Sequence, residues 1–154
     1  MESLPFKYPN KKIAVIVADD SWGNESGIGL KERAIEKGWD VALYEVVPYG
    51  TREWGPILTK IRSLKPGLIY VEIVSAPDVI TFFRQFMKAP TNSLINFGYS
   101  LVPPEFIGTM GQTANGIMGE SITSMPGPKG PTPAGEAWLK KFREEFKEEA
   151  SAGS

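Results

Sequence analysis

Two adjacent carboxylates, Asp19 and Asp20, follow an unbroken run of apolar residues at positions 13–18, and an aromatic side chain, Trp22, stands close behind them. Paired carboxylates can bind Mg²⁺ or act as a general acid and base, and a Trp on a polar loop can stack on a flat or aliphatic ligand. The apolar run is typical of a strand buried on both faces. Asp20, Asn24 and Ser26 are each plausible N-caps of the helix that would follow. Because ligands of open parallel sheets bind beyond the carboxyl ends of strands, residues 19–23 are the first candidate site.

The paired acids do not complete a phosphate-handling motif. Phosphoacceptor receiver domains also need an Asp that ends the third strand and a Lys that ends the fifth, where this sequence has Ser75 and Met125. The glycines after the first strand do not fit G-x-G-x-x-G, and no G-K-[ST] occurs. Two carboxylates would also repel a phosphate. We therefore interpret Asp19 and Asp20 as part of a solvated loop that caps a helix, rather than as a Mg²⁺ site.

The residue types present exclude several further classes of function. The chain of 154 residues contains no Cys and no His, which excludes disulfides, thiol nucleophiles, Cys/His zinc sites and Ser-His or Cys-His mechanisms. Lys and Arg number 17 against 18 for Asp and Glu, so no basic bias indicates nucleic acid. No apolar run approaches the length of about 18 residues that a membrane span needs. We expect a soluble, globular protein with no catalytic residue, no cofactor and no metal.

Polar and aromatic side chains also stand after the third and fourth predicted strands. Ser75 and Ala76 follow the third strand, and Tyr99 and Ser100 follow the fourth. A Ser hydroxyl and the free N–H groups of a helix start can hold a polar ligand atom, although Ser75 can equally be a simple N-cap. A loop Trp can likewise pack over its own helix instead of a ligand. The candidate ligand-binding residues are Trp22, Ser75, Ala76, Tyr99, Asp20 and Ser100.

Glu72 lies inside the third predicted strand, in the segment YVEIV. A buried carboxylate is costly unless it is paired. It could face the carboxyl end of the sheet and bind a cation, or it could pair with an Arg or Lys at the sheet edge. Because structural ion pairs are common, we favour the second interpretation.

Strand and helix patterns alternate along the chain and would position these residues. Apolar segments recur at the spacing of βαβ units, and stretches with helical periodicity separate them. The sequence therefore predicts an α/β fold, a three-layer sandwich around a five-stranded parallel sheet of the flavodoxin or Rossmann type. The strands are expected at residues 13–18, 41–47, 68–74, 93–97 and 116–122.

A segment rich in Pro and Gly, MPGPKGPTP at residues 125–133, follows the α/β unit of residues 11–124 and indicates a linker. A helix is expected after it at residues 134–149, with Thr132 as its N-cap and Pro133 at its first position. Large apolar side chains recur on one face of this helix, so that face should be buried. They are Trp138, Leu139, Phe142 and Phe146.

Four segments resemble, in their order and spacing, one lobe of a type I periplasmic binding protein, in the branch of branched-chain amino-acid and amide receptors. The segments are KKIAVIVADDSWG, GLKERAIEKGWDV, YGTREWGPILTKIRSLKPGLIYV and MGQTANGIMG, which together span about residues 11–124. The resemblance implies two α/β lobes joined by a three-strand hinge, with the ligand trapped between them. By this resemblance the chain looks like the second lobe alone, with residues 1–10 as a hinge remnant and residues 150–154 as a tail.

The same resemblance implies an aromatic contact to the ligand at Trp22. Amino-acid receptors of this family hold the α-ammonium group with a carboxylate near the position of Tyr99, where this sequence offers Tyr99 and Ser100 instead. A Tyr hydroxyl suits a neutral polar group or a carboxylate. The implied function is capture of an amino acid, an amide or an aromatic acid for ABC-type import. The implied partners are the missing first lobe and an ABC permease, in the periplasm or outside the cell.

Two other functions stay open on the sequence alone. The chain could be a cytoplasmic small-molecule sensor domain of a regulator, or an acid-dependent α/β enzyme that uses Asp19 and Asp20. Residues 1–10 lack the basic and apolar segments of a signal peptide, so the sequence is either cytoplasmic or cut from a longer precursor. The apolar face of the C-terminal helix is expected to pack on the missing lobe. Because that lobe is absent, we expect the helix to pack on a second copy of the chain in a homodimer.

Overall fold

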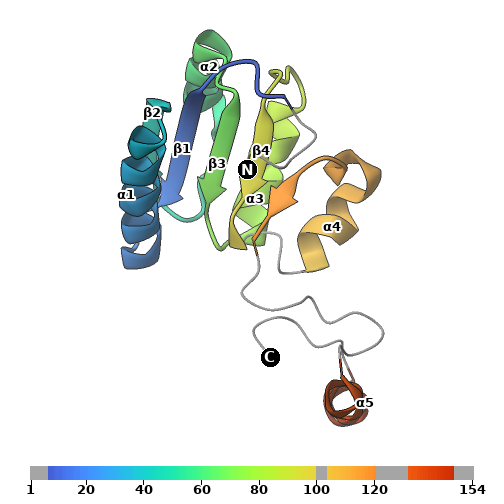
Figure 1. Cartoon of the computed structure of the whole chain (residues 1–154). Helices are drawn as coiled ribbons and strands as arrows, with labels where there is room; N and C mark the ends of the chain where they lie inside the picture. Colours follow the sequence, from blue (N-terminus) through green and yellow to red (C-terminus); the bar gives the residue numbers. More distant parts are fainter. Residues whose placement is uncertain (1–6, 100–103, 121–131, 148–154) are drawn as a thin grey trace.

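The centre of the molecule is a parallel β-sheet, seen in a computed structural model that describes residues 7–99, 104–120 and 132–147 (Figure 1). Within these residues the sheet has five strands in the order β2-β1-β3-β4-β5, and every neighbouring pair is parallel. The predicted fold class is therefore confirmed. The strands are β1 (Lys12–Ala18), β2 (Asp40–Val47), β3 (Leu68–Glu72), β4 (Leu94–Phe97) and β5 (Met118–Gly119).

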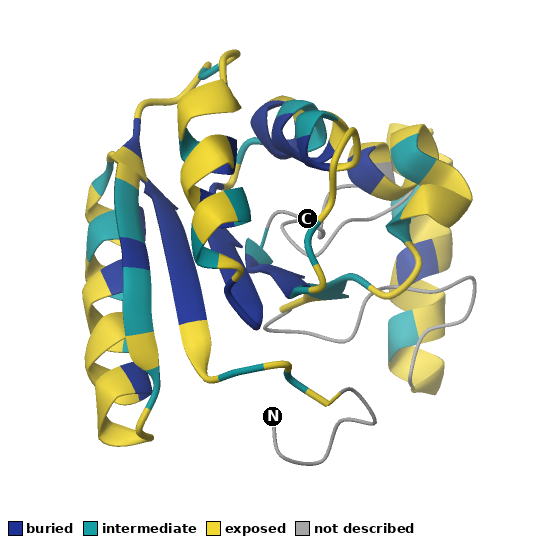
Figure 2. Ribbon diagram, turned by 90° about the horizontal axis from the view of Figure 1, so that it is seen from above, coloured by how far each residue is buried: buried dark blue, intermediate teal, exposed yellow. Residues whose placement is uncertain are grey.

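Helices cover both faces of the sheet and complete three layers. One face packs with α1, whose Ala34 joins Val15 and Leu68 in one apolar cluster. The other face packs with α2, α3 and α4 in a larger cluster. Figure 2 shows the buried strands between the helices. The helices are α1 (Ser21–Glu36), α2 (Gly55–Leu64), α3 (Ala76–Phe86), α4 (Pro104–Met110), the 3₁₀ turn η2 (Gly111–Ala114) and α5 (Pro133–Phe146).

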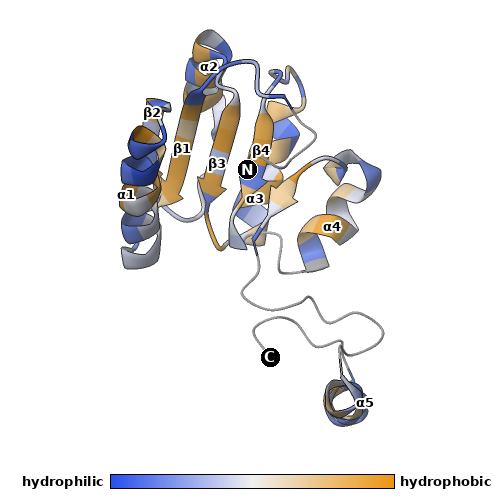
Figure 3. Ribbon diagram, viewed as in Figure 1, coloured by the Kyte–Doolittle hydropathy of each residue, from blue (hydrophilic) through white to orange (hydrophobic). Residues whose placement is uncertain are grey.

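Buried apolar side chains hold these layers together. Every residue of β1 after Lys12 is buried, as expected for a central strand with both faces covered. In Figure 3, β1, β3 and β4 have mainly the orange colour of hydrophobic residues. On the second face Phe83, Phe97 and Phe106 form an aromatic group with ring centroids 5.3–5.9 Å apart. Burial of each large apolar side chain stabilises the fold by roughly 1.5–3 kcal/mol, so this group fixes α3 and α4 on the sheet.

The ends of several elements differ from the expected ones. Strand β3 ends at Glu72, two residues before the predicted end. Strand β5 begins at Met118, two residues after the predicted start, because Gly116 has φ +85° and is part of a turn. The last two residues of the predicted strand, 121 and 122, lie outside the described residues. Helix α5 begins at Pro133, and Thr132 caps it by accepting a hydrogen bond from the Gly135 N–H at 3.0 Å, as predicted. Most of the predicted linker and the whole tail lie outside the described residues.

The described helices are all too short or too polar to cross a membrane.

Gly23 lies where the first turn of α1 passes over the end of β1. A Cβ atom at this position would lie 2.4 Å from the carbonyl oxygen of Ala18, which is a backbone atom of the central strand. Gly23→Ala should therefore lower the free energy of unfolding by about 1–3 kcal/mol, as overpacking in a core does. Urea unfolding followed by circular dichroism measures this change.

Gly29 supplies a matched control in the same helix, since a Cβ atom there meets nothing within 4 Å. Gly29→Ala should leave stability unchanged or raise it by up to about 1 kcal/mol, because Ala has the higher helix propensity. Equal stability of the two variants would contradict the close packing of α1 on β1.

Candidate functional site

The candidate site is the carboxyl edge of the sheet, where the loops after β1, β2, β3 and β4 meet. The strands are parallel, so all their carboxyl ends lie at one edge. Trp22 follows β1, Ser75 follows β3 and Tyr99 follows β4. The structure therefore places these three predicted residues at the same edge.

Of the three N-cap candidates in the sequence, the structure selects Asp20 as the N-cap of α1. Its Oδ1 accepts a hydrogen bond from the Gly23 N–H at 2.6 Å, and its Oδ2 accepts one from the Tyr49 hydroxyl at 2.5 Å. Both bonds lower the pKa of Asp20, and the bond from the Gly23 N–H has the larger effect. Partial burial and, to a smaller extent, the bond to Asp20 raise the pKa of Tyr49 to about 12. At neutral pH Asp20 is therefore charged and Tyr49 keeps its proton, and together they fix the loop after β1 to the loop after β2.

Asp19 is exposed, and its backbone N–H donates to the Val47 carbonyl at 2.8 Å. The described residues contain no group of three or more Asp, Glu, His or Cys side chains that could hold a metal ion. Because Asp20 is engaged by the helix start and by Tyr49, the geometry does not support its use with Asp19 as an acid–base pair.

Trp22 and Tyr99 face each other across the end of β3. The Trp22 side chain is 53% exposed, and its ring meets the Tyr99 ring edge-on at a centroid distance of 5.6 Å. Its Nε1–H donates to Glu72 Oε1 at 3.3 Å. The indole thus has one fixed edge and one open surface, which is the arrangement needed to stack on a ligand.

Glu72 is almost completely buried, with 1% of its surface exposed. Its carboxylate accepts hydrogen bonds from the Tyr70 hydroxyl at 2.7 Å, from the Trp22 indole and, at the long distance of 3.5 Å, from the Tyr99 N–H. The ion pairs of the described residues do not include Glu72. The expected pairing with an Arg or Lys is therefore wrong, because neutral donors on three segments already surround the carboxylate.

Burial raises the pKa of Tyr70, and the hydrogen bond to Glu72 raises it further. Tyr70 therefore remains a hydrogen-bond donor at every physiological pH. The sequence held a signal for this contact, because residues two apart on a strand point to the same face. Gly98 leaves room for the carboxylate, since a Cβ atom there would lie 1.9 Å from Glu72 Oε2.

Ser75 is the N-cap of α3, but its side chain makes no capping hydrogen bond. The alternative of a simple capping Ser is therefore not supported by the geometry, although its carbonyl accepts from the N–H groups of Asp78 and Val79. Ser75 is half-buried and Ala76 is buried. The Ser75 hydroxyl is thus left at the edge without a role in the helix start.

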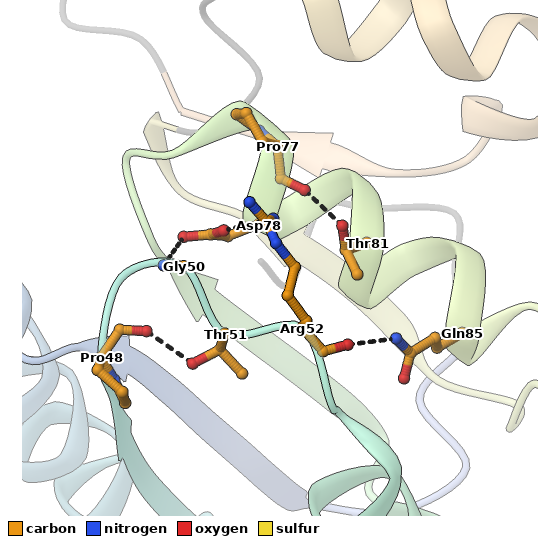
Figure 4. Close-up of polar contacts among 8 residues, drawn as sticks. All are labelled: Pro48, Gly50, Thr51, Arg52, Pro77, Asp78, Thr81 and Gln85. Carbon is orange, nitrogen blue, oxygen red and sulfur yellow. Dashed lines mark hydrogen bonds and ion pairs between the residues drawn. The ribbon is translucent and has the colours of Figure 1, made fainter.

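The loop between β2 and α2 is tied to α3 by a cluster of polar contacts, shown in Figure 4. The Asp78 carboxylate is buried and accepts from the Gly50 N–H at 2.8 Å and from the Arg52 guanidinium at 3.2 Å. Gln85 donates to the Arg52 carbonyl at 2.6 Å and accepts from the Trp54 N–H at 3.1 Å. These bonds make this loop a fixed border of the site.

The candidates do not all come together. Trp22 and Tyr99 are in contact, and Asp20 is the N-cap of the helix whose first turn contains Trp22. Ser75 and Ala76 follow β3 at the same edge. Ser100 lies outside the described residues.

Comparison with known proteins identifies related molecules. The model of a protein family described as periplasmic binding protein matches residues 5–154. No curated protein matches the sequence. A solved structure from Silicibacter pomeroyi, assigned as a branched-chain amino acid ABC transporter, superposes with a TM-score of 0.81 at 29% identity. That match covers 96% of this chain and 36% of the other.

Two further structures have the same fold at lower identity. A leucine-binding protein from Thermotoga maritima has a TM-score of 0.68 at 20% identity, and the match covers 92% of this chain and 40% of that one. A solute-binding protein of an ABC transporter from Rhodopseudomonas palustris, in complex with benzoate, has a TM-score of 0.74 at 18% identity and coverages of 93% and 38%. The chain therefore spans well under half the length of the structures it matches.

Substitution of Asp20 tests the capping contact and its charge. Asp20→Ala removes the acceptor for the Gly23 N–H and should lower the free energy of unfolding at pH 7 by about 0.5–2 kcal/mol, the range for a lost N-cap. Asp20→Asn keeps an acceptor and should cost less. The folded-state pKa of Asp20 lies below its unfolded value of about 3.9, so the charge stabilises the fold above that pH and ceases to do so as the pH falls through the folded-state pKa.

Urea unfolding between pH 7 and about pH 3 measures both effects, and the stability of the parent chain should approach that of Asp20→Asn at the acid end. Asp40→Asn, at an exposed Asp, is the control and should change stability at pH 7 by less than about 0.5 kcal/mol. A difference between parent and Asp20→Asn that stays constant with pH would contradict the charged cap.

Proposed function

The chain belongs to the periplasmic binding protein family, and we propose that it is one lobe of a two-lobe solute receptor for ABC-type import. In this proposal the receptor is a binding module and not an enzyme. It captures a small polar or amphipathic ligand, such as an amino acid, an amide or an aromatic acid. The coverage of 36% to 40% of the related structures supports the assignment of a single lobe.

The observation that carries this proposal is the half-exposed Trp22, held edge-on to Tyr99 at the carboxyl edge. A large aromatic ring left open to solvent in the first turn of a helix offers apolar area to a ligand. The Ser75 hydroxyl, which does not cap its helix, is a further polar group at the same edge of the sheet. An open aromatic surface combined with a few polar groups is typical of small-molecule binding.

Ligand capture would proceed by closure of two lobes around the ligand. A ligand shifts a receptor toward its closed state only by the extra contacts that it makes there. This lobe would supply the wall formed by Trp22, Ser75 and Tyr99, and a second lobe would supply the opposite wall. The proposed partners of the complete receptor are that first lobe and an ABC permease, in the periplasm or outside the cell.

The charges of the described edge favour one orientation of the ligand. Asp19, Asp20, Glu72 and Asp78 lie at this edge, and Arg52 is the cation that pairs with Asp78. An anionic ligand group that faced this lobe would be repelled. We therefore propose that the ligand turns an apolar or hydrogen-bond-donating part toward this lobe, and any carboxylate toward the other. The relatives bind leucine in one case and benzoate in another, and both molecules have a carboxylate and an apolar part.

Helix α5 supports a second part of the proposal, which concerns self-association. Figure 1 shows α5 away from the sheet and its covering helices. Leu139 is buried, whereas Trp138 is 47% exposed and Phe146 is 56% exposed. The rings of Trp138, Phe142 and Phe146 contact one another in series, at centroid distances of 5.2 and 4.7 Å. An apolar face of this kind favours association, and we propose that it takes part in a homodimer.

Trp22→Ala tests ligand binding in the two-lobe receptor. Loss of an aromatic anchor should weaken binding by roughly 1–3 kcal/mol, while stability should change less. Isothermal titration with L-leucine and with benzoate measures the affinity. Ile28→Ala removes an equally exposed apolar side chain from the same helix and should leave the affinity unchanged. Equal affinities of the Trp22→Ala and Ile28→Ala receptors would refute the proposed site.

Truncation after Ser124 tests the role of α5 in self-association. The full chain of 154 residues should scatter light as a dimer, and the truncated chain should scatter as a monomer, because the exposed aromatic face has been removed. Size-exclusion chromatography with multi-angle light scattering measures both masses. A monomeric full chain would contradict the proposed dimer and would show that α5 does not mediate self-association.

A further inference from the structure

The buried carboxylate of Glu72 is the point where three segments of the carboxyl edge converge. Trp22 belongs to the first turn of α1, Tyr70 to β3, and Tyr99 to the segment after β4. Each donates a hydrogen bond to Glu72, at 3.3, 2.7 and 3.5 Å respectively. Trp22 and Tyr99 are also the two aromatic residues of the proposed ligand wall.

The burial of Glu72 makes these bonds obligatory. A carboxylate with 1% of its surface exposed cannot exchange a lost donor for water. Rotation of the carboxyl group would leave buried polar atoms unpaired, so the group resists rearrangement. The Tyr70 hydroxyl, which lies on the same strand face two residues away, anchors Oε2 and leaves Oε1 directed to Trp22 and Tyr99.

The backbone closes the remaining side of the carboxylate. A Cβ atom on Gly98 would lie 1.9 Å from Glu72 Oε2 and 2.6 Å from its Cδ. The end of β4 therefore passes directly against the group, and only a residue without a side chain fits there. Both the strand register and the absence of a side chain at position 98 hold Glu72 in place.

We propose that Glu72 is a positioning residue for ligand binding, which orients the Trp22 indole and the Tyr99 backbone without contacting the ligand. This inference rests on the proposed function of the edge. Trp22 is half-exposed in the first turn of α1 and would otherwise sample several rotamers. With Nε1 bound to Glu72 and one edge against Tyr99, its ring is oriented before the ligand arrives. A preorganised wall improves affinity because less side-chain freedom is lost on binding.

The positioning role needs the acceptor oxygens more than the charge. In Glu72→Gln the amide oxygen can still accept from Trp22 and Tyr99, and the amide N–H can donate to the Tyr70 oxygen. In Glu72→Met the chain length is retained but all three donors lose their acceptor. The two variants therefore separate the geometry of the contact from its charge.

Nuclear magnetic resonance of the whole chain tests the positioning without any ligand. The readout is the indole Nε1–H signal of Trp22, identified by its loss in Trp22→Phe. In Glu72→Met this signal should shift and its hydrogen exchange should become about fivefold faster, because one hydrogen bond is lost. Glu72→Gln should retain most of the protection. Glu45→Met, at a Glu that pairs with Lys60, is the matched control and should leave the signal unchanged.

Titration of the two-lobe receptor with L-leucine and benzoate gives the second readout. Glu72→Met should weaken the binding of whichever probe the parent binds by about tenfold, and Glu72→Gln should restore most of it. If Glu72→Met does not fold, Gly98→Ala displaces the same carboxylate and should shift the same indole signal. An unchanged Trp22 signal in the folded variant overturns the inference. If the parent binds neither probe, the proposed function fails, while the indole signal still decides whether Glu72 positions Trp22.

Discussion

A carboxylate buried at the end of a central strand must be surrounded by hydrogen-bond donors, and this requirement shapes the carboxyl edge of the sheet. The parallel register sets Val17 of β1 opposite Glu72 and Tyr70 of β3 opposite Asn96 of β4. The residues just beyond these strands, Trp22 on one side and Tyr99 on the other, therefore reach Glu72 from its two flanks. Two aromatic side chains distant in sequence thus become one wall, whose geometry depends on a group that is almost inaccessible to solvent.

The fold was predictable because its signals are local and repeated. Short apolar runs flanked by helical periodicity indicate parallel strands, and the α1 start is encoded by Asp20 two residues after β1. The edge residues were also predictable, since parallel strands must end on the same side. Trp22 and Tyr99 could be assigned to one edge without any knowledge of the distance between their rings.

The contacts of Glu72 with Trp22 and Tyr99 and the state of Ser75 could not be predicted, because both depend on tertiary neighbours. A carboxylate in a strand can be compensated by a cation or by neutral donors, and the choice depends on which residues the adjacent strands bring beside it. Ser75 has the residue type of an N-cap, but its side chain does not form the bond. Gly116 delays the start of β5 through a positive φ, and Gly is the residue type that most readily adopts this conformation.

The rigidity of this edge bears on how a receptor of two lobes would use its binding energy. The loops after β1 and β2 are joined by Asp20 and Tyr49, and the loop after β2 is joined to α3 by Asp78. A wall fixed in this way needs little reordering when a ligand arrives, so ligand contacts are available to stabilise lobe closure. A single rigid wall, however, gives a ligand contacts on one side only. In the proposed receptor the lobe therefore sets the orientation of the ligand, and the affinity arises when the second lobe closes over it.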